Sequence, residues 1–215
     1  MNPDKCPVAV LISGGGTTLK NLLDWQNAGK AEFQVALVIS SSENAGGLQF
    51  AEQAGIPSCV ISKQKSDTDS QAFSEAIFQR CDLAEVRYVV MGGFLKLLPI
   101  PDRYEDRVIN IHPSLIPAFC GKGFYGNRVH QSVLDYGCKV SGCTVHLVDN
   151  QFDHGPILAQ ATVEVRDGDT AAILQQRVFD RECELYPEVL NQISVGGLQR
   201  QERWVTLSPQ KASPE

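Results

Sequence analysis

The stretch VAVLISGGGTTLKNLLDWQ, residues 8–26, decides the fold. Residues 8–13 form a continuous apolar run that ends at three glycines, which is typical of a strand buried on both faces of a parallel sheet. After the glycines, Leu19, Leu22 and Leu23 recur at near-helical spacing. A strand, a glycine turn and a helix together predict the first unit of an α/β fold.

The alternation of strand-like and helix-like segments continues along the first half of the chain. The segments with strand-like composition are residues 33–40, 58–62, 87–94 and 107–112, and those with helical spacing are residues 47–55 and 70–81. This order predicts right-handed crossovers and an open, mostly parallel, twisted sheet of Rossmann-like type.

The second half has a different pattern. Residues 125–137 read as a helix ended by a glycine, and residues 141–149 and 157–166 as an antiparallel pair added to the sheet. A long C-terminal helix follows at residues 169–193, opened by an Asp-Thr cap, and a short strand is indicated at residues 203–207.

Because no repeat or linker is visible, we expect one domain over residues 1–215. Its first half spans about residues 1–105 and its second half about residues 106–200, followed by a polar tail at residues 201–215.

Charge and cysteine usage exclude several classes of protein. The net charge of −6 opposes a protein that coats nucleic acid, because phosphate binding draws on a basic surface. The seven cysteines are scattered without a CxxC pair, which indicates reduced thiols rather than a zinc knuckle or redox dithiol. The N-terminal apolar run is too short for a signal peptide or membrane span. We therefore expect a cytoplasmic protein without a nucleic-acid or membrane partner.

The loop SGGGTTL, residues 13–19, is suited to an anion. Its glycines expose backbone N–H groups, and the helix N-terminus and threonine hydroxyls favour negative charge. The loop lacks the third glycine of a dinucleotide fingerprint and the lysine of a triphosphate loop, so a single phosphate on a sugar is predicted. A plain tight turn is the alternative.

Two polar side chains stand at the end of the fifth predicted strand. Asn110 and His112 project from the same face, at the carboxyl end of a parallel strand, where open α/β sheets bind their ligands. The loop DNQFDHGP carries Asp149 and Asp153, and one of these carboxylates is expected to approach His112 and favour its charged form.

The remaining candidates are more ambiguous. His130 is interpreted as a surface or interface residue, and His146 equally as a satisfied sheet histidine or as support for the site. The segment GGFLKLLP, residues 92–99, indicates an apolar slot at the same sheet edge or a buried strand-to-helix corner.

Four segments, taken in order, resemble those of the folate-dependent formyltransferases over about residues 8–195. They are VLISGGGTTL, GGFLKLL, INIHPSLIPAF and GCTVHLVDNQFDHGPILAQ. The glycine-rich loop is most similar to that of the branch that formylates glycinamide ribonucleotide. This implies transfer of a formyl group from 10-formyltetrahydrofolate, as co-substrate, to the amine of that ribonucleotide. The transfer would proceed without a metal, through a tetrahedral intermediate, as the third step of de novo purine biosynthesis.

The resemblance implies that residues 1–105 are the phosphate-binding half and residues 106–200 the catalytic and folate half. It also implies roles for individual residues. It assigns catalysis to Asn110, His112 and Asp153. It places the substrate at Gly15, Gly16, Thr17, Thr18 and Glu182. It places the folate at Phe94, Leu95, Lys96, Leu97 and Leu98 and at Asp149, Asn150, Gln151 and Phe152. Both ligands are small molecules, and a monomer or homodimer is expected.

The chain departs from the family pattern at several positions. Thr17-Thr18 replaces the usual Ser-Asn, and Leu95-Lys96 replaces Met-Arg. Ser70 aligns with the basic residue that holds the glutamate tail of the folate, with Lys63 or Lys65 as substitutes. The loop CGKGFYG, residues 120–126, is unlike the usual one.

Three alternatives stay open. A formyltetrahydrofolate hydrolase (deformylase) uses water as acceptor, and a methionyl-tRNA formyltransferase carries a further tRNA-binding domain. A non-catalytic Rossmann-type nucleotide-binding module would need an acid for the ribose, for which Glu43 is a weak candidate.

Overall fold

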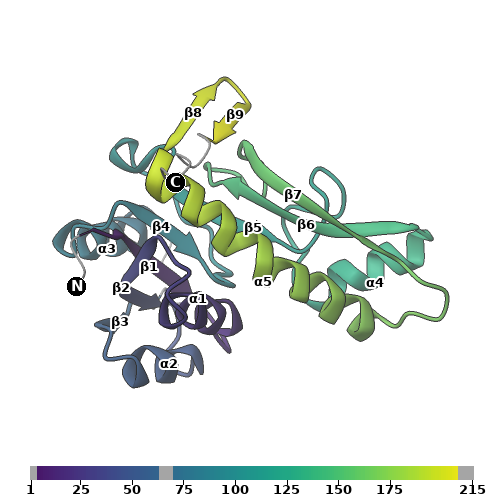
Figure 1. The fold of residues 1–215 in the computed structure, drawn as a ribbon, viewed down its shortest axis with the longest axis horizontal. Coiled ribbons are helices and arrows are strands. Elements are labelled where there is room, and N and C mark those ends of the chain that lie inside the picture. Colours follow the sequence, from purple (N-terminus) through teal and green to yellow (C-terminus); the bar gives the residue numbers. More distant parts are fainter. Residues whose placement is uncertain (1–3, 63–69, 208–215) are drawn as a thin grey trace, which may run out of the picture. The chain divides into compact units, whose positions relative to one another are not determined.

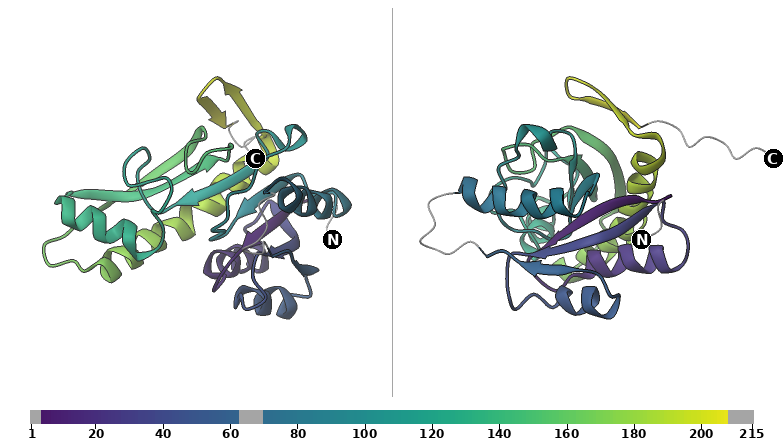
Figure 2. Two further views of the ribbon diagram at one scale, coloured as in Figure 1. Left: turned by 180° about the vertical axis from the view of Figure 1, so that it is seen from behind. Right: turned by 90° about the vertical axis from the view of Figure 1, so that its left-hand side faces the viewer.

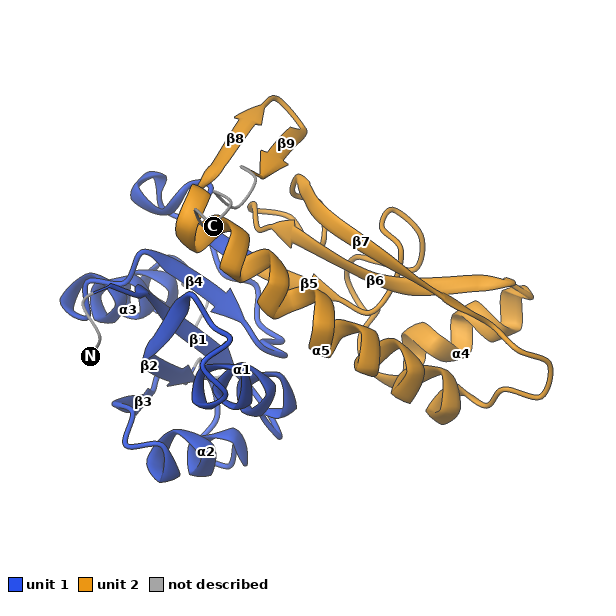
Figure 3. Ribbon diagram, in the orientation of Figure 1, with its two compact units in different colours: residues 1–109 blue, residues 110–215 orange. Residues whose placement is uncertain are grey.

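The computed structural model describes residues 4–62 and 70–207, so Lys63 and Lys65 lie outside the described residues. The chain separates into two compact units, residues 1–109 and 110–215 (Figure 3). A seven-stranded sheet has the order β3 (Ser58–Val60), β2 (Phe33–Ser40), β1 (Cys6–Ile12), β4 (Tyr88–Met91), β5 (Val108–His112), β6 (Val140–Leu147) and β7 (Ile157–Glu164). A two-stranded sheet pairs β8 (Leu198–Gln201) with β9 (Trp204–Leu207). The predicted α/β class and its antiparallel extension are confirmed.

Unit 1 holds the parallel part of the fold. Its strands are β1 (Cys6–Ile12), β2 (Phe33–Ser40), β3 (Ser58–Val60) and β4 (Tyr88–Met91), and its helices are α1 (Thr17–Asn27), α2 (Gly47–Gln53) and α3 (Ser70–Leu83), with a 3-10 turn at Asp102–Tyr104. β1 pairs in parallel with β2 and β4, and β2 with β3. The predicted third and fourth strands end early, at Val60 and Met91, because the chain turns away to form loops.

The turn from β1 to α1 depends on glycine. Gly16 has a left-handed φ of 74°, and a Cβ there would lie 2.4 Å from the Cα of Gly47. Gly47 N also donates to Gly14 O at 3.1 Å, so the loop and the start of α2 are in backbone contact. A side chain at Gly16 would separate them.

Unit 2 begins at Asn110, inside β5 (Val108–His112), so the first two residues of this strand belong to unit 1. Unit 2 contains α4 (Asn127–Tyr136), β6 (Val140–Leu147), β7 (Ile157–Glu164), α5 (Ala171–Gly196), β8 (Leu198–Gln201) and β9 (Trp204–Leu207). β6 and β7 are antiparallel, as predicted, and α5 packs along both (Figure 1). The same packing is seen from behind in the left view of Figure 2.

The ends of α5 follow from local chemistry. The Thr170 hydroxyl accepts from Ile173 N at 3.3 Å, which is the predicted N-terminal cap. After Gly196 the chain forms the β8–β9 hairpin, of which only the second strand was predicted. Among the helices of the described residues, none has the length and apolar character to cross a membrane.

Candidate active site

Unit 2 brings together the side chains of His112 and Asp153. His112 ends β5, and Asp153 lies in the loop between β6 and β7, which we call the β6–β7 loop (residues 148–156). The distance from His112 Nδ1 to Asp153 Oδ2 is 3.5 Å, and both side chains are largely buried, at 6% and 12% exposed. His112 Nε2 lies 3.0 Å from Phe119 O. Both ring nitrogens therefore face acceptors, and a doubly protonated imidazole can donate toward both.

Asn110 is oriented by His146, a residue of β6. His146 Nδ1 lies 2.8 Å from Leu147 O, and the Asn110 amide Nδ2 lies 3.1 Å from His146 Nε2. Burial lowers the pKa of His146, so the ring is neutral. A neutral ring that donates from Nδ1 to the carbonyl accepts the amide proton at Nε2, which turns the amide nitrogen toward His146. Both sequence interpretations of His146 thus apply, because the ring is satisfied within the sheet and also supports the site.

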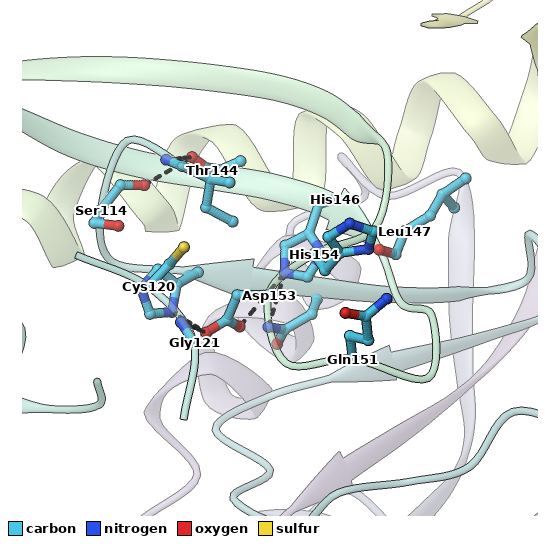
Figure 4. Close-up of polar contacts among 12 residues, drawn as sticks. Ser114, Cys120, Gly121, Thr144, His146, Leu147, Gln151, Asp153 and His154 are labelled. Carbon is cyan, nitrogen blue, oxygen red and sulfur yellow. Dashed lines mark hydrogen bonds and ion pairs between the residues drawn. The ribbon is translucent and has the colours of Figure 1, made fainter. Parts of the chain in front are cut away.

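Asp153 is held by its backbone and by the unusual loop after β5. Its φ is 51°, in the left-handed region, and its Oδ2 accepts from Gly121 N at 2.8 Å (Figure 4). Phe119 O and Gly121 N thus contact the two acid–base side chains, His112 and Asp153. The loop at residues 120–126 was left unassigned by the sequence, and its first residues lie directly at this site.

Cys120 lies beside this contact, and its thiol is in the protonated form. Burial raises the pKa of the Cys120 thiol, and the negative charge of Asp153 raises it further. The other six cysteines are also free thiols.

The interpretation of His130 as a surface residue was wrong. His130 is 1% exposed, on the inner face of α4 with Val129 and Val133. Burial lowers its pKa to about 4, and the nearby His112 contributes, so the ring is neutral. Its Nδ1 has no hydrogen-bond partner among the described residues. The spacing of His130 and Val133, three residues apart on one helix face, was the available signal.

Thr144 supports the turn that follows β5, a role the sequence did not reveal. Its hydroxyl donates to Ser114 O at 2.7 Å and accepts from Ile116 N at 3.1 Å. Gln160 Nε2 donates to Ile116 O at 3.0 Å and to the same hydroxyl at 2.9 Å. The backbone N–H and C=O groups of the turn after β5 therefore have hydrogen-bond partners, and these bonds hold the turn to β6 and β7.

In unit 1 the predicted phosphate loop exposes backbone. Gly14, Gly15 and Thr17 are exposed, and Thr18 is half-buried at the start of α1. Ser13 Oγ accepts from Leu95 N at 3.0 Å and lies 2.7 Å from Ser41 Oγ. One serine thus joins the glycine loop to the segment predicted to hold the folate.

The two predicted folate segments each expose apolar side chains. In unit 1, Phe94 and Leu98 are buried, whereas Leu95 and Leu97 are 58% and 39% exposed. In unit 2, Phe152 is 40% exposed, at the tip of the β6–β7 loop. Lys96, Asn150 and Gln151 are exposed, and Asp149 is half-buried.

Glu182 lies half-buried on α5, and burial raises the pKa of its carboxyl to about 8. Below about pH 4.5, its ordinary value, the group is protonated in the folded and unfolded states alike. As the pH rises, the unfolded chain ionises first, so the folded state loses stability until about pH 8. Glu182 therefore disfavours folding at neutral and alkaline pH.

Glu182→Gln is expected to raise the free energy of unfolding by about 2 kcal/mol or more near pH 9, because the amide carries no ionisation penalty. The gain should vanish near ~pH 4, below the ordinary carboxyl pKa. Urea unfolding of both proteins at the two pH values measures this, with Glu184→Gln, an exposed neighbour on α5, as control. A difference independent of pH would refute the burial effect.

Within residues 4–62 and 70–207, no group of three or more His, Cys, Asp or Glu side chains is arranged to hold a metal ion. The site is thus an arrangement of a carboxylate, an imidazole and an amide in a largely buried setting. Such a set can stabilise an oxyanion and move a proton.

The chain belongs to the formyl transferase family, whose model matches residues 6–190. It is 34% identical, over 99% of its length and 74% of the relative's, to phosphoribosylglycinamide formyltransferase, chloroplastic, of Arabidopsis thaliana. It is 31% identical to phosphoribosylglycinamide formyltransferase of Escherichia coli, over 97% of this chain and 96% of that protein. The crystal structure of glycinamide ribonucleotide transformylase 1 from Symbiobacterium toebii superimposes with a TM-score of 0.87 at 35% identity, covering 96% of this chain and 95% of that one.

A second kind of enzyme has the same fold. A formyltetrahydrofolate deformylase from Pseudomonas syringae matches with a TM-score of 0.84 at 22% identity, over 95% of this chain and 66% of that one. At this identity the likeness concerns the fold alone. The identities to the formyltransferases are higher, which favours transfer over hydrolysis.

Proposed function

We propose that this chain transfers the formyl group of 10-formyltetrahydrofolate to the amine of glycinamide ribonucleotide, the third step of de novo purine biosynthesis. The observation that carries the proposal is the meeting of His112 and Asp153, with the oriented amide of Asn110, in a chain of the formyl transferase family. The names of its relatives supply the acceptor.

The first step is attack of the free amine on the formyl carbon, which develops an oxyanion. Asn110 gives one amide proton to His146 and has a second to donate to this oxygen. One well-placed donor of this kind is worth about 3 kcal/mol of transition-state stabilisation. His112, when protonated, stabilises the same charge from the end of the same strand.

The second step is movement of a proton from the attacking amine to the folate nitrogen. Asp153, 3.5 Å from His112, is placed to order a water molecule that accepts the amine proton. His112 donates a proton to the folate nitrogen, and the amine proton then passes through that water to restore the proton on His112. The oxidation state of the formyl carbon does not change, and no covalent enzyme intermediate is invoked. The tetrahedral intermediate collapses with the folate nitrogen as leaving group.

Binding of the two substrates is assigned to residues of each unit. The backbone N–H groups of Gly15, Gly16, Thr17 and Thr18 hold the phosphate of the ribonucleotide. Glu182, largely protonated below about pH 8, can donate and accept hydrogen bonds with substrate hydroxyls. The folate is held by residues 94–98 and 149–152, whose exposed apolar members are Leu95, Leu97 and Phe152.

The test is incubation of the protein with 10-formyltetrahydrofolate, with and without glycinamide ribonucleotide, while loss of the formyl group is followed by absorbance. Loss that depends on the ribonucleotide is the expected result. Loss at the same rate without it would identify a hydrolase instead. If the formyl group is not lost in either case, the result would indicate a non-catalytic nucleotide-binding module.

We propose a cytoplasmic location, on the basis of the free thiols. The plant relatives are named chloroplastic, so location varies among relatives. The partners proposed are the two small-molecule substrates, with a monomer or homodimer as the assembly.

A further inference from the structure

We propose that Arg203, in the turn of the C-terminal hairpin, is a positioning residue that holds the β6–β7 loop in the shape needed to bind folate and present Asp153. This inference rests on the proposed function for its kinetic consequence, although its structural part stands without it. Arg203 is more than forty residues from the loop in sequence, and both belong to unit 2.

The contacts begin at the hairpin. Glu202 and Arg203 form the two-residue turn between β8 and β9, and Glu202 has a left-handed φ of 55°. Arg203 Nη2 donates to His154 O at 2.7 Å, and Arg203 Nη1 lies 3.5 Å from His154 Nε2. One guanidinium thus contacts both the backbone and the side chain of a single loop residue.

The contacts continue through His154 to the other end of the loop. His154 Nδ1 lies 2.6 Å from Asp149 Oδ2, and Asp149 Oδ1 accepts from Gln151 N at 2.8 Å. The second contact is an Asx-type turn, in which the side chain sets the direction of the backbone. Arg203, His154 and Asp149 therefore form a continuous chain of contacts, which we call the loop clamp.

The loop clamp acts on Asp153 through the backbone. Asp153 directly precedes His154 and has a φ of 51°, a conformation that few residues other than glycine adopt readily. On the other side of His154, a Cβ at Gly155 would lie 1.9 Å from Leu147 O, so that residue is packed against β6. The backbone is thus fixed before Asp153 at Gln151 and after it at His154 and Gly155, which gives the Asp153 carboxylate one direction, toward His112.

Charge gives the loop clamp a second effect. Two carboxylates, Asp149 and Asp153, stand four residues apart in one short loop and repel each other. The Arg203 guanidinium contacts the His154 ring, and the same ring contacts the Asp149 carboxylate. The positive charge of Arg203 therefore lies on the side of the loop where Asp149 is held. Since His154 is 48% exposed and Asp149 35%, solvent screens these contacts, and the expected effects are moderate.

The first experiment needs no substrate. Amide hydrogen exchange of the β6–β7 loop is compared in the parent protein, Arg203→Ala and Gln201→Ala, the last an exposed position on the same hairpin. In Arg203→Ala the exchange of the Gln151 amide is expected to rise by about tenfold, because its Asx turn loses the support of His154. Gln201→Ala should exchange like the parent.

The second experiment is kinetic. Arg203→Ala is expected to raise the KM for 10-formyltetrahydrofolate by about three- to tenfold and to leave the KM for glycinamide ribonucleotide within about twofold. Arg203→Lys should recover part of the loss, because an ammonium still donates to His154 O but lacks the planar fork. His154→Ala keeps the backbone oxygen that accepts from Arg203 but removes the side chain that contacts Asp149. Combined with Arg203→Ala its effect should be less than additive, because the two changes interrupt the same chain of contacts.

Each result decides something. Unchanged loop exchange in Arg203→Ala would overturn the loop clamp, as would equal rises in both KM values accompanied by a lower melting temperature, which indicate general destabilisation. If the parent protein shows no formyl transfer while Arg203→Ala loosens the loop, the proposed function fails and the structural role of Arg203 stands.

Discussion

His112→Ala is expected to lower kcat for formyl transfer by at least about 100-fold, because it removes both the positive charge near the oxyanion and the group that relays the proton. His112 is 4% exposed, so solvent does not readily replace it. Steady-state kinetics with both substrates varied measures the effect. Since the loss concerns the transition state, kcat should fall while both KM values change little.

The matched control for this substitution is His154→Ala, which removes an imidazole from a half-exposed position of the β6–β7 loop. It is expected to change kcat/KM by no more than about tenfold, through the loop clamp. Turnover of His112→Ala within about fivefold of the parent would remove His112 from the mechanism.

Asp153→Asn is the second substitution for which a loss of about 100-fold or more in kcat is expected. The amide keeps the size of the side chain, and asparagine tolerates the left-handed φ of 51°, so the loop should keep its shape. What is lost is the negative charge, 3.5 Å from His112 Nδ1, and with it the group proposed to order the water molecule that accepts the amine proton.

The control is Asp135→Asn, an exposed carboxylate on α4 that accepts a hydrogen bond from Gln131 Nε2. It should have parental kinetics. Turnover of Asp153→Asn within about fivefold of the parent would contradict the assignment. Melting temperatures of both variants show whether the fold is kept.

Much of the fold was predictable because each element carries its own local signal. Val8–Ile12 is apolar without interruption because both faces of β1 are buried, and all five residues are 0% exposed. Gly137 ends α4 with a left-handed φ of 81°, and Thr170 caps α5. Periodicity, a C-terminal glycine and an N-terminal hydroxyl are read from a few neighbouring residues.

What escaped prediction depends on residues far apart in sequence. β8 (Leu198–Gln201) is polar, and it is a strand because it pairs with β9. Thr144 is an ordinary strand residue by composition, and its role appears only when Ser114 and Ile116 lie against it. His130 was interpreted as a surface residue because single histidines usually are exposed. That argument takes no account of the helix face on which His130 lies.

The candidate site, like the fold, combines features that the local sequence predicts with contacts that it does not predict. The sequence motif contains Asn110, His112 and Asp153, and the first two share a strand face by the period of a strand. The nearness of Asp153 to His112 and the contact of Gly121 with Asp153 join segments whose connection no local pattern specifies. The roles of these residues in catalysis remain predictions, which the two substitutions above address.

The boundary between the two compact units falls inside β5, between Ile109 and Asn110. Units joined by a flexible linker can gain or lose residues at the joint as genes diverge. A strand has no such freedom, because one inserted residue turns every following side chain to the opposite face. An insertion at this joint would reverse Asn110 and His112 together. Length variation should therefore collect in surface loops and avoid the joint.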